Sequence, residues 1–271
     1  MIHTHNSQPS PSNHHLGLIA AVLLLLTSAT FSCQNKNSFT LEGTLENGAD
    51  KTLYIEELTP DGPEFLDSIY LDKNGHFIFS KKMKYQTFYN LHTNDIDYVV
   101  LLPEKGEHIT LTGDYRSLQW SYEVEGSYGS MLLWQIQDFS NYGISALTDI
   151  MAKDSENRKR YGDDSVAYKN AKEETDSIFR EALTEQTDYI TKFLQDNKGS
   201  LASLIALYKQ FNRHEIISPE VNFDYYELVL EGLEESCADN PHTIHFKNIV
   251  ERLRHQFGQP KQALDLVFDG E

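Results

Sequence analysis

Apolar and polar residues alternate with a period of two from Phe39 to about Gly126. Alternation of this kind places the apolar side chains on one face of a strand. Several short strands separated by turns predict an antiparallel β-sandwich or an open barrel. The apolar positions of the expected strands are Phe39, Leu41, Leu45, Leu53, Ile55, Ile69, Leu71, Phe77, Phe79, Ile109, Leu111, Tyr122 and Val124.

Two turns and one apolar run add detail to this expectation. Asp72-Lys73-Asn74-Gly75 contains an Asn-Gly pair, which tolerates positive φ and predicts a two-residue hairpin. Glu104-Lys105-Gly106-Glu107 predicts a second tight turn. The run from Tyr98 to Leu102 is continuously apolar, so we expect a central strand that is covered on both faces.

After Gly126 the hydrophobic period becomes that of helices, with apolar residues three or four positions apart. Such stripes are the core-facing sides of helices. The sequence therefore predicts an α+β protein, with a β-sandwich or open barrel at residues 39–126 and an α-helical region at residues 127–271. The stripes are Leu132, Ile136, Phe139, Leu147 and Ile150; Phe179, Leu183, Ile190 and Leu194; Leu201, Leu204, Ile205, Tyr208 and Phe211; Phe223, Tyr226, Leu230 and Leu233; and Phe246, Ile249, Val250, Leu253 and Phe257.

The segment from Lys153 to Asp176 is rich in charge and poor in apolar residues. Mixed-sign charge of this density indicates an exposed loop or the solvated start of a long helix. A binding arm is the functional alternative for the same segment.

The first 32 residues have the layout of a secretory signal peptide. The uncharged run LGLIAAVLLLL, residues 16–26, is followed by small and polar residues up to Phe31-Ser32-Cys33. This run falls short of the roughly 20 apolar residues that a transmembrane helix needs. We therefore expect residues 1–32 to be removed on export.

Ser32-Cys33 resembles the lipobox of bacterial lipoproteins, and this implies cleavage after Ser32 and lipid on Cys33. Residues 33–38 would then form a lipidated tether. Gln34, which is not acidic, follows the cysteine, and the usual sorting logic then places the protein in the outer membrane, facing the periplasm. No Lys or Arg precedes the apolar run and Phe31 is bulky for a lipobox, so a cleaved signal with an unmodified Cys33 stays open.

Every acidic and basic residue lies after Cys33, so the mature chain carries the whole formal charge of −18. This acidity argues against nucleic acids and anionic lipid surfaces as partners, because both are bound through basic patches. Membrane attachment is therefore expected through the lipid anchor. Cys237 is the only other cysteine, so no intramolecular disulfide can form once Cys33 is lipidated.

Several segments taken together resemble a domain of unknown function of Bacteroidetes lipoproteins, which usually precedes a thioredoxin-like (AhpC/TSA or TlpA-type) module. The segments are FTLEGTL, LYIEE, EFLDSIYLDKNGHFIFS, LLPEKGEHITLTGDY and EGSYGSMLLWQIQDF. A later segment, FLQDNKGSLASLIALY, resembles the helical connector ahead of that module. In the longer relatives the resemblance implies a thiol-disulfide oxidoreductase, which needs a Cys-x-x-Cys pair. The present sequence ends at Glu271, about where that module would begin, and contains no such pair.

The remaining candidates for chemistry are few. Acidic residues surround Cys237, so we expect a half-buried structural cysteine and not a redox thiol. His242 and His245 are three positions apart and share a helix face, as metal ligands often do, but no third ligand is fixed nearby. Asp67 and Ser68 are neighbours on a strand and point to opposite faces, so they cannot act as a pair. His214-Glu215 is a less specific candidate. Aromatic residues that could line a ligand groove, or simply pack the core, are Tyr85, Phe88, Tyr89, Tyr98, Trp120 and Tyr122.

We therefore expect a non-enzymatic, periplasm-facing lipoprotein that acts as a binding or interaction module, with a protein partner in the envelope. It would need no cofactor, and Cys33 is the only residue to which the sequence assigns a role. One alternative is a truncated or accessory form of a thioredoxin-like oxidoreductase, whose catalytic part is lost or lies on another chain. A second alternative is a metal-dependent hydrolase that uses His242 and His245.

Overall fold

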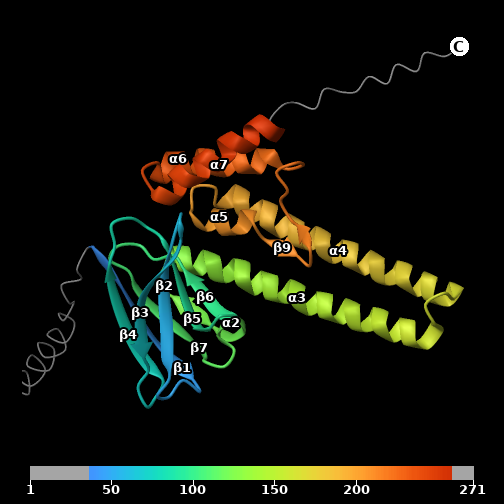
Figure 1. The fold of residues 1–271 in the computed structure, drawn as a ribbon, viewed down its shortest axis with the longest axis horizontal. Coiled ribbons are helices and arrows are strands. Elements are labelled where there is room, and N and C mark those ends of the chain that lie inside the picture. The colour runs from blue at the N-terminus through green and yellow to red at the C-terminus, as the bar shows by residue number, and fades with distance from the viewer. Residues whose placement is uncertain (1–36, 258–271) are drawn as a thin grey trace, which may run out of the picture. The chain divides into compact units, whose positions relative to one another are not determined.

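The strands of the amino-terminal half form two four-stranded sheets that pack face to face (Figure 1). The computed structural model describes residues 37–257. One sheet has the strand order β4-β1-β7-β8 and the other has the order β3-β2-β5-β6. The strands are β1 Ser38–Glu46, β2 Thr52–Thr59, β3 Gly62–Tyr70, β4 His76–Lys82, β5 Phe88–Asn94, β6 Asp97–Leu101, β7 His108–Asp114 and β8 Glu123–Glu125.

The predicted alternation gives the core of this sandwich. Phe39 and Leu41 on β1 face Leu53 and Ile55 on β2, and all four side chains are fully buried. Apolar side chains of the other strands complete the cluster between the sheets. Burial of this cluster is the main term that holds the two sheets together. The sheets stay open at their edges, so the structure is a sandwich and not a closed barrel.

Strand β1 lies in the middle of its sheet and pairs differently on its two sides. It is antiparallel to β4, with Leu41 opposite Phe79, and parallel to β7, with Leu41 opposite Ile109. The sequence predicts an antiparallel sandwich, and this one parallel pair departs from it. A parallel pair needs a long crossover, and here the crossover runs from β1 through strands of both sheets before β7 returns to its side.

The predicted hairpin at Asp72–Gly75 is wrong, because β3 and β4 belong to different sheets. The turn instead carries the chain across the sandwich. The Asp72 carboxylate accepts hydrogen bonds from the backbone N–H groups of Asn74 at 2.7 Å and His76 at 3.0 Å. Gly75 has φ +76°, and a Cβ there would lie 2.2 Å from the Leu45 carbonyl oxygen. Glycine is therefore required by a crossing between sheets and not by a hairpin.

Strand β6 is an edge strand, so the predicted central position of the Tyr98–Leu102 run is wrong. Its apolar character has another cause. Val99 and Leu101 point into the core between the sheets, whereas Val100 and Leu102 pack against the helices. Tyr98 is 45% exposed. The run is apolar because the strand lies between two hydrophobic cores.

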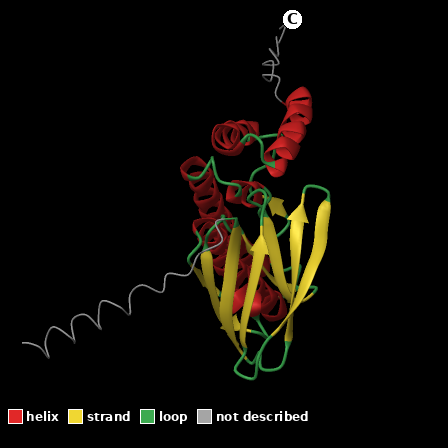
Figure 2. Ribbon diagram, turned by 90° about the vertical axis from the view of Figure 1, so that its left-hand side faces the viewer, coloured by secondary structure: helices red, strands yellow, loops and turns green. Residues whose placement is uncertain are grey.

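Helices follow the sandwich, and the predicted α+β class is confirmed. In Figure 2 some of the helices lie behind the strands and the others stand above them. A second hydrophobic cluster joins the helices and includes Phe88 and Leu102 from the sandwich. The stripe predicted from Leu201 to Phe211 is helical only as far as Leu207, and Phe211 lies on a short strand. The elements are α2 Leu118–Ser121, α3 Tyr128–Tyr161, α4 Val166–Asp196, α5 Ala202–Leu207, β9 Gln210–Phe211, β10 His214–Glu215, α6 Phe223–Cys237 and α7 Pro241–Phe257.

The last strand of the sandwich ends at Glu125 and α3 begins at Tyr128. The division into separate domains at residues 39–126 and 127–271 stays a prediction. Signal-peptide residues 1–32 and the greater part of the tether, Cys33 included, lie outside the described residues. None of the helices that the structure describes has the length and apolar content needed to cross a membrane.

Helices α3 and α4 form a long antiparallel hairpin, which in Figure 1 runs on beyond the other labelled elements. The charged segment Lys153–Asp176 forms its far end, so the predicted loop is reduced to residues 162–165. Gly162 ends α3 with φ +76°, and the Ser165 hydroxyl caps α4 by accepting the N–H of Tyr168. Lys153 on α3 forms an ion pair of 2.8 Å with Glu174 on α4. The charged residues of this segment thus flank the turn between α3 and α4.

Candidate interaction sites

Cys33 lies outside the described residues, so its predicted lipidation stays a prediction. Cys237, the other cysteine, lies at the end of α6 and is partly buried. Its Sγ is 3.3 Å from the Thr243 hydroxyl on α7 and 3.6 Å from the Ser236 hydroxyl. These contacts give Cys237 a place in the packing between the last two helices.

His242 and His245 play different parts on α7. The Nε2 atom of His242 is 2.9 Å from the Thr87 hydroxyl, and its ring meets Phe88 edge-on with the centroids 5.1 Å apart. Burial lowers the pKa of His242 below its ordinary 6.5, and the nearby His245 lowers it further. His245 is exposed. In residues 37–257 no group of three or more His, Cys, Asp or Glu side chains is placed to hold a metal ion.

The other polar candidates do not form a reacting pair. Asp67 and Ser68 are both exposed on β3, and the Ser68 N–H donates to the Asp67 carboxylate at 2.7 Å. His214 lies on β10 with its ring 5.5 Å from that of Phe179 on α4. Neither arrangement places a nucleophile beside a base. The structure gives these residues local, structural contacts.

The aromatic candidates divide into two groups. Phe88, Tyr89 and Tyr122 are buried in the hydrophobic clusters. The other three are exposed: Tyr98 lies on β6, Trp120 on α2 and Tyr85 in the connection between β4 and β5.

A cleft of about 380 Å³ lies where the β4–β5 connection meets the start of α7. Its basic side chains are Lys81, Lys82 and Lys84, with His242 at the α7 side. Lys81 is 3.9 Å from the Glu57 carboxylate, and Lys84 lies over the Tyr85 ring at 4.8 Å from its centroid. The cleft is therefore partly neutralised by its own contacts, and His242 within it is already bonded to Thr87.

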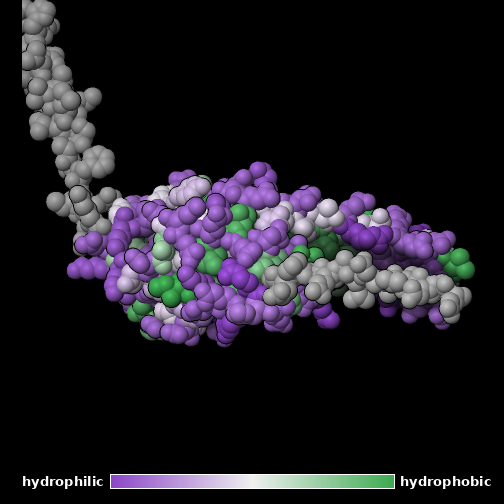
Figure 3. All heavy atoms as spheres, turned by 90° about the horizontal axis from the view of Figure 1, so that it is seen from above, coloured by the Kyte–Doolittle hydropathy of each residue, from purple (hydrophilic) through white to green (hydrophobic). Residues whose placement is uncertain are grey.

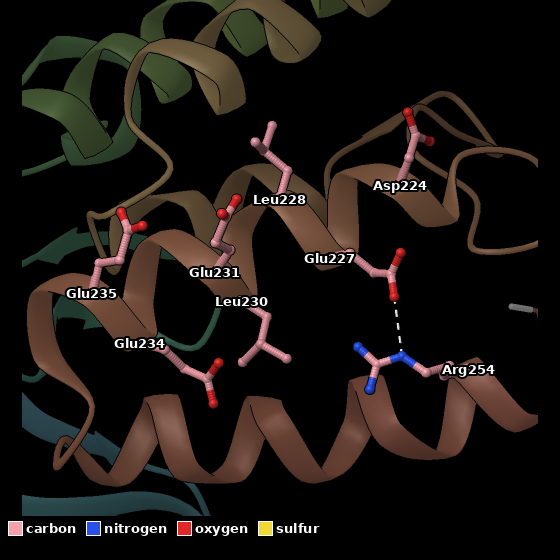
Figure 4. A pocket seen from close by; sticks show the side chains of 8 residues that line it. All are labelled: Asp224, Glu227, Leu228, Leu230, Glu231, Glu234, Glu235 and Arg254. Atoms are coloured by element: carbon pink, nitrogen blue, oxygen red, sulfur yellow. Dashed lines mark hydrogen bonds and ion pairs between the residues drawn. The ribbon is translucent and has the colours of Figure 1, made fainter.

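An open groove of about 640 Å³ runs between α6 and α7 and carries five carboxylates (Figure 4). Figure 4 shows the bond from Arg254 on α7 to Glu227 on α6, which is 3.0 Å long. Lys247 binds Glu234 at 2.8 Å, and Lys198 lies 3.4 and 3.8 Å from Glu231 and Glu235. Four of the five carboxylates thus have a basic partner. These ion pairs are made by three basic residues, connect α6 to its neighbours and offset more than half of the negative charge of the groove.

The α3–α4 hairpin differs, because its contacts with other elements extend along α4 only as far as Phe179, which stacks on Phe211 of β9 with the ring centroids 5.5 Å apart. Near the sandwich, Phe139 stacks on Tyr189 with centroids 3.8 Å apart, and Gly143 leaves room for the buried Gln186. Beyond Gly143 the buried side chains of the hairpin are Tyr168 and Thr175 alone among the described residues. The far part is held mainly by contacts between its own two helices.

One face of this hairpin is hollowed along its length. Two adjoining depressions of about 720 and 380 Å³ share Glu181 and Glu185, and we call them together the hairpin groove. Its floor is apolar and its rims are charged. The residues of the hairpin groove are Phe139, Tyr142, Ala146, Asp149, Ile150 and Lys153 on α3 and Ser177, Ile178, Arg180, Glu181, Ala182, Thr184, Glu185, Asp188, Tyr189 and Lys192 on α4.

The carboxylates of the hairpin groove differ from those of α6, most of which form ion pairs. Asp149, Glu181, Glu185 and Asp188 have no ion-pair partner within the part of the chain that the structure describes. The surface drawn in Figure 3 is mainly hydrophilic, with small and separate hydrophobic areas.

Sequence reasoning did not find this groove, although the charged segment from Lys153 was a partial signal. The apolar stripe of α3 predicts one buried face, but only Leu132, Leu133 and Ile136 at its sandwich end are fully covered. Ile150, farther along, is only partly covered. Tertiary packing determines how far along α3 other elements cover the apolar stripe. The stripe alone carries no information on this.

Comparison with known protein families gives a match in the amino-terminal half of the chain. Residues 39–131 match a family described as a domain of unknown function, DUF4369. This span covers the sandwich and the first residues of α3, and it supports the expectation of a domain of unknown function in this part of the chain. No curated protein matches the chain.

Proposed function

We propose that this chain is a lipid-anchored protein of the bacterial envelope that faces the periplasm and binds a protein partner through its α3–α4 hairpin. The observation that carries the proposal is the hairpin groove, with its apolar floor and its unpaired carboxylates. Binding, and not catalysis, is the activity that this surface supports. The sandwich serves as the base on which the hairpin is mounted.

The hairpin leaves apolar surface uncovered. Tyr142, which lines the hairpin groove, is 56% exposed on α3. Helices in water gain most of their stability from packing an apolar face against other elements. A third helix laid in the hairpin groove would cover its apolar floor and supply that packing. Exposed apolar surface with a polar rim is typical of a protein-binding site.

The hairpin is also well suited to present a surface. Its turn is capped at both ends by Gly162 and Ser165, and Arg158 bridges Asp154 and Asp163 around it. The base is fixed to the sandwich, because the Ser130 hydroxyl on α3 accepts the Leu102 N–H at 3.0 Å. A surface on ordered helices binds with less loss of conformational entropy than one on a loop.

The position in the envelope rests on Ser32-Cys33 and the apolar run before it. Metabolic labelling with a fatty-acid analogue tests it. We expect label on the wild type and none on Cys33→Ala. Equal labelling of the two proteins would remove the lipid anchor from the proposal and leave the binding surface to be judged separately.

The partner is tested on detergent-extracted membranes by native electrophoresis. We expect the wild type to migrate as a complex larger than the single lipoprotein and Glu181→Lys/Glu185→Lys to migrate as the free protein. The matched control is Glu123→Lys/Glu125→Lys, which makes the same change in net charge on exposed residues of β8. A wild type that migrates alone, or a complex that both double variants lose equally, would contradict the proposal.

A further inference from the structure

The hairpin groove has the length of a helix. On α4 it extends from Ser177 to Lys192. At a rise of 1.5 Å per residue this span is about 22 Å, or about four helical turns. The larger depression follows α4 over this span, with Phe139 as its only lining residue from α3, and the smaller one lies between the two helices from Ile178 to Glu185 of α4. A surface between two antiparallel helices accepts the side-chain ridges of a third helix. An occupant of about 15 residues in helical form therefore matches its size.

The floor of the groove selects an apolar face. Ala146 and Ala182 are small and lie on opposite helices, so a backbone can approach closely between them. Ile150 and Ile178 continue the floor toward the hairpin turn. An occupant would therefore present apolar side chains at helical spacing.

The rims of the groove select the charge of the occupant. The two lysines at its ends are already paired, Lys153 with Glu174 at 2.8 Å and Lys192 with Asp196 at 2.7 Å. Arg180 is then the one rim cation without an ion pair in the described chain, against four such carboxylates. The four are Asp149 on α3 and Glu181, Glu185 and Asp188 on α4. The unpaired rim charge is thus clearly negative.

We infer that the hairpin groove receives a basic amphipathic helix of a partner protein, with lysine or arginine flanking its apolar stripe. This inference rests on the proposed function and specifies the partner for the same site. Opposite charges along the rims would guide the helix into register and raise its association rate.

A second copy of this chain is a poorer occupant. Two hairpins packed groove to groove would bring Glu181 and Glu185 of one copy toward the same carboxylates of the other. Like charges placed together across an interface repel each other and disfavour the pair. A basic helix meets no such cost.

The test uses the mature chain and two synthetic 15-residue peptides as probes. Both peptides carry the same leucine and alanine stripe, flanked by lysine in one and by glutamate in the other. Affinities are measured by fluorescence anisotropy at low and high salt. The protein is compared with Glu181→Lys/Glu185→Lys and with the charge-matched control Glu123→Lys/Glu125→Lys.

We expect the lysine peptide to bind the wild type at least about tenfold more tightly than the glutamate peptide, with a difference that shrinks in high salt. Glu181→Lys/Glu185→Lys should abolish the preference, and the control should retain it. Equal binding of the two peptides, binding that survives in Glu181→Lys/Glu185→Lys, or no binding of either would overturn the inference. A dimer that only the groove variant dissociates would also overturn it. These results are separate from the membrane experiment above, which can still detect a partner of another chemistry.

Discussion

The hydroxyl group of Thr87 on the sandwich joins His242 at the start of α7, with Oγ1 and Nε2 2.9 Å apart. Thr87 donates its single hydroxyl proton to the Leu58 carbonyl at 3.2 Å, which leaves the oxygen to accept the N–H of His242. Beside this pair, the Asn240 side chain donates to the Gln86 carbonyl at 2.8 Å. The sandwich and the last helix therefore share a small polar network.

Removing the Thr87 hydroxyl should destabilise the protein. In Thr87→Val the shape is kept, but the His242 N–H and the Leu58 carbonyl lose a partner at a site shielded from water. We expect a loss of about 1–3 kcal/mol in the free energy of unfolding, measured with urea. The control is Thr148→Val, because Thr148 is exposed and bonds only within its own helix; it should change stability by about 0.5 kcal/mol or less. Equal effects of the two substitutions would show that the contact contributes nothing specific.

The same contact should make stability depend on pH. Burial lowers the pKa of His242 in the folded chain below its ordinary 6.5, so the unfolded chain binds the proton more readily. The contribution of His242 is therefore complete above about pH 6.5 and is lost as the pH falls through that value toward the lowered pKa. Urea unfolding at pH 7.5 and 5.5 should show a smaller difference for His242→Gln than for the wild type. An identical pH dependence in both would contradict this assignment.

Gly129 should resist replacement even though it lies in a helix. Alanine normally stabilises a helix relative to glycine by roughly 1 kcal/mol. At Gly129 a Cβ would lie 2.4 Å from the Leu102 carbonyl oxygen, so the start of α3 would have to move away from β6. We expect Gly129→Ala to lower the free energy of unfolding by about 1–3 kcal/mol, measured with urea. A stabilised variant would show that α3 does not pack this closely on the sandwich.

Limited proteolysis should find the hairpin turn before any strand. Residues 162–165 connect the two helices and include the exposed Asp163 and Asp164. Exposed turns are preferred sites of cleavage, whereas paired strands are protected. A protease that cuts before aspartate should give two fragments that meet at this turn, identified by mass spectrometry. First cleavage inside the strands would contradict the arrangement.

The sequence predicts the inward-facing residues of the sandwich well, because period-two alternation directly reports which face of a strand is buried. Phe39, Leu41 and Leu53 all lie in the core as expected. The sequence does not predict which strands are neighbours. Asp72–Gly75 has the residues typical of a hairpin turn but connects two sheets. Tyr98–Leu102 has the composition of a central strand but lies at an edge. An apolar composition indicates that a strand is buried, and an edge strand that lies between two hydrophobic cores is buried as well.

The functional surface could be predicted only in part. The charge of Lys153–Asp176 indicated an exposed segment, and the structure makes it the end of a helical hairpin. The groove depends on which carboxylates lack partners, and this is set by the register of α3 against α4. Glu174 meets Lys153 across the hairpin whereas Glu181 meets no cation among the described residues. No spacing within either helix reveals that difference.

Site-specific photo-crosslinking shows whether a partner occupies the hairpin groove in the cell. A photoreactive amino acid replaces Tyr142, which lines the groove, or Thr148, which is exposed on the opposite side of α3. After irradiation of intact cells we expect a discrete heavier adduct from position 142, weak or absent in Glu181→Lys/Glu185→Lys, and none from position 148. Adducts of equal strength from both positions, or no adduct from position 142, would contradict the account.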